Sequence, residues 1–478
     1  MKIPGFTGKN ILSVLATILL FIPSYDIKAQ IKLPEWEAGL SSVAGIGNQA
    51  PFWIMSNRQG KFLPEKYTGA MGINFLAESD TGRMIDYDYG IELYGLQGRG
   101  SYLWLHQAWA GLTFFDVIRI RGGMQEEIIG SLQPSLSTGS VIWSGNARPM
   151  PKIEAGTPGY VSLPFTGGYV EMSGLLSHGW FEEGRYASNV WLHHKNAYIR
   201  FGGSFPLNFH YGFNHYAQWG GSSPRQEEPY PRDFKSFIKV FLNRSGDEED
   251  PDTPEGWAIN RFGNSLGSRN YGIDLTMDNF STGLYQQDIF EDGSGLRKQN
   301  FPDGLWGAWI RFPERNRIVQ AVVYEFLQTT NQSGPYHDID GDTLGGNDNY
   351  FNHGHYQSGW TYHGYTIGTP MITSPVLNNP ANRRILNNRV IAHHLGFEGN
   401  ITQNVTYRNF FTFSRNFGTY SRPFEERRDQ FSWMLEVNIP VNYFDLEAGF
   451  TIAADRGNMY GNNIGMLFSL RKRGTFLN

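Results

Sequence analysis

Apolar and polar side chains alternate along six stretches of this chain, and that pattern constrains the fold more than any other feature of the sequence. In residues 207–219 the odd positions are mostly apolar, from Leu207 to Trp219, whereas the even positions are mostly polar. Successive side chains of a β-strand point to opposite faces, so each stretch predicts a strand with one apolar and one polar face. The remaining stretches are residues 117–125, 271–278, 431–439, 444–455 and 464–471.

The length of these stretches separates a membrane barrel from a soluble sandwich, which would show the same alternation. Strands of soluble proteins average about 5–6 residues, whereas a strand that crosses a bilayer needs about 9–11. Several stretches reach the longer range, and only 18% of the chain is charged while 15% is aromatic. A membrane barrel has an apolar exterior with aromatic girdles and a polar lumen. The sequence therefore predicts an all-β fold, a transmembrane antiparallel outer-membrane β-barrel with a polar, plugged lumen.

The N-terminus is typical of a secretory signal peptide. Lys2 and Lys9 precede an apolar run at residues 11–22, and Ala29 offers the small residue at which a signal peptidase cleaves. The apolar run is too short to cross a bilayer as a helix, and a buried N-terminal helix is the alternative. We expect a signal peptide at residues 1–29 and an outer-membrane barrel with extracellular loops at residues 30–478.

Two polar connections are predicted to lie at the cell surface. Residues 245–256 are acidic and contain proline, and residues 335–355 are rich in Gly, Asn and Asp, as turns and loops are. Outer-membrane barrels carry long loops outside the cell and short turns in the periplasm. At about 25 residues for each strand with its connection, residues 30–478 give roughly 18 strands, an even number as in bacterial single-chain barrels.

Residues that could bind a metal form only weak patterns. The chain has no cysteine, which excludes disulfides, thiolate metal ligands and a cysteine nucleophile. Asp338, Asp340 and Asp342 follow the spacing of calcium loops, but glycine falls at the wrong position for an EF-hand. Asn349 also stands where an EF-hand has a bidentate glutamate. The three aspartates are a weak calcium candidate with a solvated loop as the alternative, and no cofactor is predicted.

Histidines and carboxylates outside the strands give no firmer signal. His353 and His355 would share one face of a strand, as zinc ligands sometimes do, although histidines satisfied by their neighbours are more common. The Glu291-Asp292 pair and Asp303 supply carboxylates for acid–base catalysis, but no motif fixes their separation. The sequence contains no Walker loop, and we do not expect an enzyme.

Stretches that combine tryptophan with glycine and hydrogen-bonding side chains are candidates for carbohydrate binding. Aromatic faces beside amide and guanidinium groups grip a sugar through apolar contact and directed hydrogen bonds. On this hypothesis the polysaccharide-binding residues are Trp143, Asn146, Arg148, Trp219, Asn347, Asn349, Tyr350 and Trp360. The alternative places the tryptophans in membrane girdles and pairs the arginines, among them Arg119, Arg121 and Arg148, with carboxylates inside the barrel.

The same stretches resemble the capsule assembly protein family named Wzi. The matching segments are spread over most of the chain and are specific as a set. They are Pro51-Phe52-Trp53 with Asn57 and Gly60, and residues 144–153 (SGNARPMPKI), 178–180 (HGW), 192–202 (LHHKNAYIRFG), 215–221 (HYAQWGG), 264–268 (NSLGS), 290–296 (FEDGSGL), 302–307 (PDGLWG) and 347–360 (NDNYFNHGHYQSGW).

This resemblance implies an outer-membrane barrel that acts as a lectin for capsular polysaccharide and helps to retain exported capsule at the cell surface, without catalysis. The expected partners are capsular polysaccharide, outer-membrane lipid or lipopolysaccharide, and the capsule export machinery. No nucleic acid partner is expected, because the formal net charge is −5. Family members can carry a periplasmic helical bundle, but no helical run is predicted between Gln30 and Tyr67. The rival function is a diffusion pore or transporter for small solutes.

Overall fold

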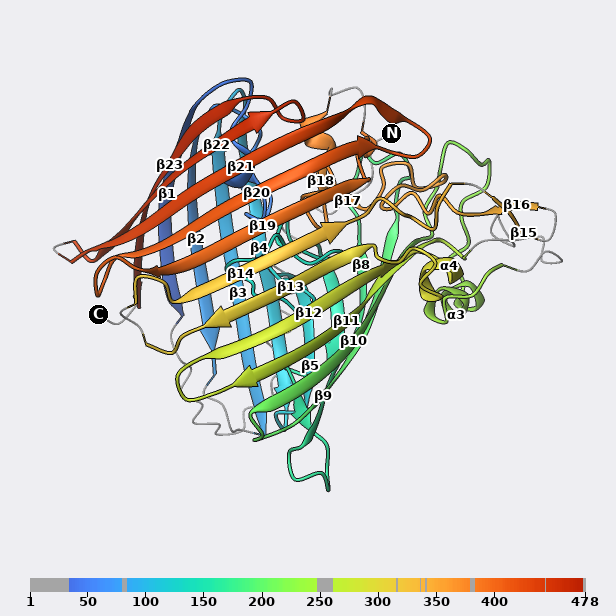
Figure 1. Cartoon of the computed structure of the whole chain (residues 1–478). Coiled ribbons are helices and arrows are strands. Elements are labelled where there is room, and N and C mark those ends of the chain that lie inside the picture. Colours follow the sequence, from blue (N-terminus) through green and yellow to red (C-terminus); the bar gives the residue numbers. More distant parts are fainter. Residues whose placement is uncertain are drawn as a thin grey trace, which may run out of the picture.

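The computed structural model describes residues 34–79, 84–246, 261–314, 317–335, 337–339, 342–378, 383–442 and 444–475. Within these ranges, the side chains of residues 337–339 and 342–345 are not described. The expected signal peptide at residues 1–29 and most of the predicted loop 245–256 lie outside the described residues. The described strands form one large barrel, shown in Figure 1.

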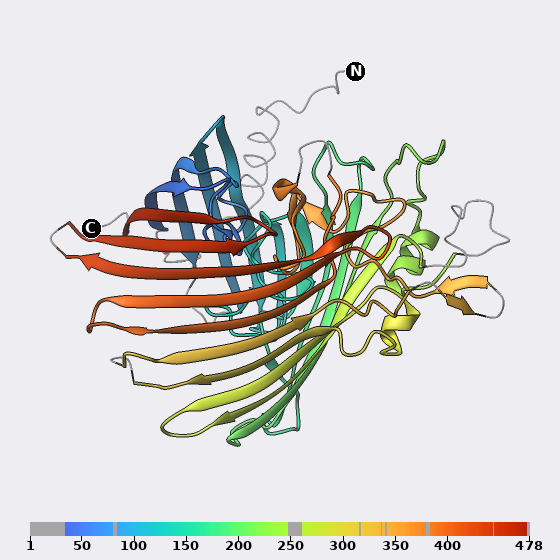
Figure 2. The ribbon, with the colours of Figure 1, turned by 45° about the horizontal axis from the view of Figure 1, so that its top comes forward.

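Antiparallel strands that follow one another in the chain pair side by side around this barrel (Figures 1 and 2). They are β1 (Glu35–Ile46), β2 (Tyr67–Glu78), β3 (Ile85–Gln97), β4 (Ser101–Phe114), β5 (Ile118–Met124), β6 (Lys152–Gly156), β7 (Val161–Ser162), β8 (Val170–Trp180), β9 (Trp191–Phe201), β10 (Leu207–Trp219), β11 (Asn264–Thr276), β12 (Ser281–Phe290), β13 (Gly304–Arg311), β14 (Ala321–Gln328), β19 (Val390–Asn400), β20 (Thr406–Gly418), β21 (Pro423–Val441), β22 (Leu446–Gly457) and β23 (Asn463–Thr475).

The barrel closes where its last strand meets its first. β23 pairs with β1 from Glu35↔Thr475 to Ile46↔Ile464, so the sheet has no free edge there. β6 and β7 both pair with the same edge of β8 and occupy one position, which reduces the 19 described strands of the sheet to a closed barrel of 18. The predicted fold class and strand number are confirmed.

The strands turn their apolar faces outward and their polar faces toward the lumen. In the periplasmic half of β10, Phe209 is 50% exposed on the outer face, while Asn208 and His210 point inward and are half-buried. This arrangement reverses that of a soluble protein and suits an exterior that meets lipid. No helix among the described residues is long and apolar enough to span a membrane.

The connections at the two ends of the barrel differ in length. At the end that holds Glu35 and Thr475, short turns such as residues 115–117 and 277–280 join the strands. Long connections gather at the other end (Figure 1), where they carry α3 (Phe234–Phe241), α4 (Gly293–Leu296), β15 (His337–Ile339), β16 (Asp342–Gly345), β17 (Thr361–Tyr362), β18 (Tyr365–Thr366) and the short 3-10 helix η1 (Pro375–Leu377). Because barrels of this kind place short turns in the periplasm, the end with the long connections is extracellular.

The extracellular half of the lumen is filled by connections that fold back between the strands. We call residues 47–66, 125–151 and 346–378 the plug. Its first segment contains α2 (Phe52–Met55), where the backbone N–H of Phe52 donates to Asp455 Oδ2 of β22 at 3.0 Å. Within the described part of residues 30–67, the segment that precedes β2 forms only β1 and this short helix.

Ion pairs line the periplasmic half of the lumen, where a cavity of about 370 Å³ remains. Arg121 Nη2 lies 2.5 Å from Glu154 Oε1, and Arg119 pairs with Asp88, so these two arginines face carboxylates as predicted. Further pairs join Arg58 and Arg408 to Glu436, and Arg311 to Glu398. The lumen is therefore polar below the plug and packed within it.

Candidate functional site

A pocket rich in arginine opens among the extracellular connections. We call it the arginine pocket; it has a volume of about 240 Å³, and Arg225, Arg384 and Arg422 are exposed at its wall. The other lining residues are Asn349, Asn352, His353, Gly354, Gln357, Ile385, Leu386, Thr419 and Ser421. Among the described residues that line the pocket, none is acidic. The wall therefore combines positive charge with amide and hydroxyl groups.

Hydrogen bonds between connections hold the wall of the pocket in place. Asn349 Oδ1 accepts hydrogen bonds from Asn388 Nδ2 at 2.9 Å and from Asn352 Nδ2 at 3.2 Å. Asn349 has a φ of +49°, a left-handed conformation that asparagine adopts more readily than most residues. In the tight turn between β20 and β21, the backbone N–H of Arg422 donates to Thr419 Oγ1 at 3.1 Å. Arg422 thus projects from a backbone position that its own turn fixes.

The histidine at the pocket wall is neutral at physiological pH. Burial, helped by the positive charge of His355 and Arg225, lowers the pKa of His353 to about 3. Its Nδ1 accepts the backbone N–H of His355 at 3.2 Å. His355 Nδ1 in turn contacts the Tyr230 hydroxyl at 2.8 Å, so this pair has protein partners in the loop rather than the shared strand face expected of zinc ligands.

The tryptophans predicted to bind sugar lie in two other places. Trp143 and Trp360 are buried inside the plug, with ring centroids 6.1 Å apart, and Trp360 Nε1 donates to Ile142 O at 2.8 Å. Trp219 is buried on the outer wall of the barrel, 5.9 Å from the ring of Phe237 in α3. These three indoles pack against protein and present no open face to a sugar.

The remaining predicted residues divide between the plug and the arginine pocket. Asn146 Nδ2 donates to Thr366 O at 3.0 Å and is buried in the plug, and the Arg148 guanidinium lies 3.9 Å from the centre of the Trp104 ring. Tyr350 is fully buried. Asn349 lines the pocket, and Asn347 is a buried neighbour in the same loop. The structure thus brings one of the predicted residues to the pocket wall.

Sequence reasoning missed the three arginines that define the pocket. Arg225, Arg384 and Arg422 belong to three different connections, each without a motif. The adjacent Arg383 and Arg384 were a local sign of concentrated positive charge in this part of the chain. The pocket exists only because the barrel brings these connections to one end.

The carboxylates considered for catalysis support the loops instead. Glu291 Oε1 accepts the backbone N–H of Phe351 at 2.8 Å, and Asp303 accepts the backbone N–H groups of Asn331 and Gln332 at 3.0 and 2.7 Å. Neither residue lines the arginine pocket. Each carboxylate fixes a neighbouring segment of backbone.

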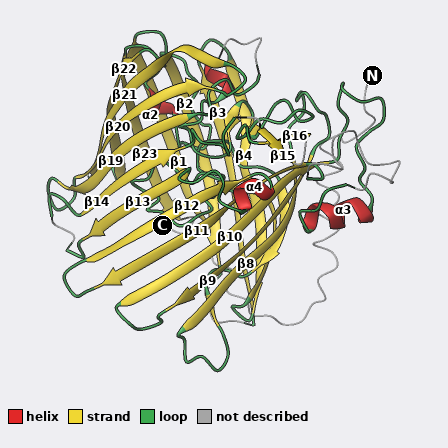
Figure 3. Ribbon diagram, turned by 45° about the vertical axis from the view of Figure 1, so that its right-hand side comes forward, coloured by secondary structure: helices red, strands yellow, loops and turns green. Residues whose placement is uncertain are grey.

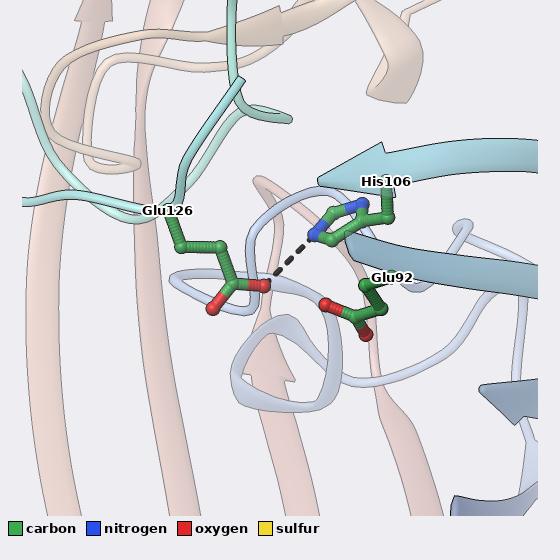
Figure 4. A group of neighbouring side chains, drawn as sticks. All are labelled: Glu92, His106 and Glu126. Atoms are coloured by element: carbon green, nitrogen blue, oxygen red, sulfur yellow. Dashed lines mark hydrogen bonds and ion pairs between the residues drawn. The ribbon is translucent and has the colours of Figure 1, made fainter. Parts of the chain in front are cut away.

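A group with metal-ligand chemistry lies where the plug meets β3 and β4, and there Glu92, His106 and Glu126 bring their ligand atoms together (Figure 4). His106 Nε2 is 2.8 Å from Glu126 Oε1, and Lys61 Nζ lies 2.8 Å from a carboxylate oxygen of both Glu92 and Glu126. The Lys61 ammonium already supplies the positive charge that these carboxylates need, so a metal ion would have to displace it. Of the weak calcium candidates, Asp340 lies outside the described residues, and the side chains of Asp338 and Asp342 are not described.

A closed antiparallel barrel with an apolar exterior, a plugged polar lumen and long connections at one end defines a plugged outer-membrane β-barrel. The family model of the capsule assembly protein Wzi matches residues 56–373, and the chain belongs to this family. The resemblance noted in the sequence, and the location in the outer membrane, are thereby confirmed.

The solved structures that match this chain are distant in sequence. The structure of Wzi from Escherichia coli, described as an outer membrane protein involved in Group 1 capsule assembly and a carbohydrate-binding β-barrel, has 14% identity and a TM-score of 0.57. The match covers 98% of this chain and 89% of that one. OccK5 (OpdH) from Pseudomonas aeruginosa has 8% identity and a TM-score of 0.48, over 92% of this chain and 97% of that one. A search of curated protein sequences found no match.

Proposed function

We propose that this capsule assembly protein binds capsular polysaccharide at its extracellular end, through the arginine pocket, and so helps to retain the capsule at the cell surface. One observation carries the proposal: three exposed arginines from separate connections converge on a pocket whose described lining has no acidic side chain. A site of this charge selects a polymer that bears carboxylate or other anionic groups.

The lining chemistry matches a charged sugar. The planar guanidinium of arginine forms paired hydrogen bonds with a carboxylate, and Asn352, Gln357 and Ser421 offer amide and hydroxyl groups for sugar hydroxyls. The volume of about 240 Å³ is below the roughly 300–1,000 Å³ of pockets that enclose a drug-sized ligand. This is the size expected when only part of a long polymer enters the pocket.

The proposed activity is binding without catalysis. The carboxylates considered for catalysis, Glu291 and Asp303, accept hydrogen bonds from backbone N–H groups and are not among the residues that line the pocket. Prolonged incubation of purified protein with the polymer should leave the polymer length unchanged, and shortening of the chains would contradict this part of the proposal. Two further partners belong to it: the lipopolysaccharide around the barrel, and the capsule export machinery, which rests on family membership alone.

The experiment that tests this function measures capsule retention in cells. Deleting the gene from its host should move capsule from the cell-bound fraction to the medium, and the wild-type gene should restore it. The double variant Arg225→Glu with Arg422→Glu should restore it poorly, while Arg99→Glu, an exposed arginine in a different extracellular turn, should restore it fully. Unaltered cell-bound capsule in the deletion strain would contradict the proposal.

A further inference from the structure

Helix α3 lies outside the barrel wall rather than in the lumen, as Figure 3 shows. Its inner face packs on the outward-facing side chains of β9 and β10. The ring of Phe237 lies 5.7 Å from His193 and 5.9 Å from Trp219, and Lys195 donates a hydrogen bond to the carbonyl of Phe241. These contacts fix the helix against the upper part of the wall.

The wall beneath α3 carries polar side chains. Along β10 the outer face changes from exposed Phe209 to His215, which is paired across the ladder with Lys195 on the same face. His215 Nε2 contacts Ser265 Oγ at 2.9 Å, so a third polar group lies on this face. Exposing polar side chains to the hydrocarbon of a bilayer costs free energy, and α3 covers these polar side chains of the wall.

A tryptophan cluster marks the height of α3 on the barrel. Trp180, Trp191 and Trp219 surround His178 on the outer wall, with ring centroids 5.1, 5.1 and 6.1 Å from it. Tryptophan concentrates at the boundary between membrane and water. Phe237 contacts Trp219, so α3 lies at the same height on the barrel as this cluster.

The side of α3 that faces away from the barrel carries a row of apolar residues. Phe234, Ile238 and Leu242 are 77%, 36% and 47% exposed, and their spacing of four residues puts them in one row along the helix. Lys235 and Lys239 lie on the same short helix. An apolar row with basic residues beside it is typical of helices that lie in a membrane interface.

We propose that α3 is an interfacial helix that seats Phe234, Ile238 and Leu242 in the outer leaflet of the outer membrane, at the level of the headgroups. The apolar row continues the lipid-facing exterior of the barrel, and the positive charge of the helix complements the phosphates of lipopolysaccharide. The helix thereby completes the outer surface where the strands carry polar side chains. This role is independent of polysaccharide binding.

The test uses nitroxide spin labels on the full chain, which has no cysteine of its own. Phe234→Cys and Ile238→Cys are labelled in vesicles of phosphatidylcholine with phosphatidylglycerol, and collisions with oxygen and with a water-soluble nickel chelate are compared. Phe209→Cys, on the lipid-facing wall, and Glu228→Cys, in an exposed extracellular connection, are the matched controls. Labels on α3 should collide more readily with oxygen than with the nickel chelate, as the label at residue 209 does.

Two outcomes would overturn the proposal. Access to nickel equal to that at residue 228 would mean that the row faces water. Protection from both reagents, with spin–spin coupling between protein copies, would mean that a second copy covers the helix instead of lipid. Leaving out phosphatidylglycerol should lower the oxygen preference at residue 238 and leave that at residue 209 unchanged, and an equal change at both residues would refute the role of headgroup charge.

Discussion

The indole ring of Trp143 stacks on the phenol ring of Tyr216, with centroids 5.5 Å apart and planes 14° from parallel. Trp143 belongs to the plug and Tyr216 faces inward from β10, so this stack joins the plug to the barrel wall. On a distant part of the wall, the backbone N–H of Phe52, also in the plug, donates to Asp455 Oδ2 of β22 at 3.0 Å. The plug is therefore attached to strands far apart around the barrel, and the extracellular half of the lumen is closed.

The closed lumen predicts that the purified protein gives no steady current in planar bilayers. The attachments of the plug are buried, and opening them would break stacking and hydrogen bonds together. A diffusion porin in the same bilayer serves as the positive control. Stable single-channel steps from the wild-type protein would instead favour the diffusion pore, the rival function considered from the sequence.

We predict that substitution of Glu325 in β14 destabilises the plug more than any other single substitution. The Glu325 carboxylate accepts hydrogen bonds from Thr138 N and Oγ1, both at 2.7 Å, and from Ser137 Oγ and the Tyr285 hydroxyl, both at 2.5 Å. Glu325→Ala leaves these buried donors without an acceptor and should lower the free energy of unfolding by roughly 3–5 kcal/mol.

Limited proteolysis of residues 125–151 and the apparent melting temperature at one fixed scan rate measure this effect. Glu325→Gln keeps one acceptor oxygen and should lose less stability than the alanine variant. Equal melting temperatures and equal cleavage in wild type and Glu325→Ala would show that the plug does not depend on this anchor.

We predict that the stability of the folded protein depends on pH through Asp348, which lies in the extracellular connection between β14 and β19. Burial, together with the negative charge of Asp292, raises the pKa of Asp348 from 3.8 to about 6, although Ser333 Oγ donates to its carboxylate at 2.7 Å. Because the folded state holds the proton more tightly than the unfolded state, the stability from this group is complete below pH 4. It is lost as the pH rises through 6.

The variant Asp348→Asn imitates the protonated carboxyl and should be more stable than wild type above pH 6, by on the order of 1–2 kcal/mol, with no difference below pH 4. Melting temperatures between pH 4 and 8 measure the difference. Asp278→Asn, at an exposed carboxylate of a periplasmic turn, should follow the wild-type profile. If the melting temperature of Asp348→Asn also follows that of wild type over this pH range, the protonation of Asp348 does not contribute to stability as proposed.

The barrel could be predicted from sequence because each strand contains its own signal. Residues 207–219 were predicted from alternation alone and coincide with β10 at both ends. The alternation is strong there because the outer face meets lipid and the inner face meets a polar lumen. The environment therefore determines which residue types occur on each face.

The plug and the site could not be predicted in the same way. Residues 335–355 have the composition of an exposed loop, yet Tyr350 and Phe351 are fully buried, since the connection folds back over the lumen. The composition of a connection does not reveal whether it points outward or inward. For the same reason, the sequence suggested that Trp143 and Trp360, which are buried in the plug, bind sugar.

Direct binding of purified capsular polysaccharide to the purified protein tests the central claim most directly. A charge-assisted hydrogen bond contributes about 1.5–3 kcal/mol, so the loss of one predicts roughly tenfold weaker binding. Surface plasmon resonance or calorimetry should show binding by wild type and by Arg99→Glu that weakens as salt rises. Binding should be lost in the double variant Arg225→Glu with Arg422→Glu. Equal affinity of the double variant and wild type, or no binding by wild type at low salt, would contradict the account.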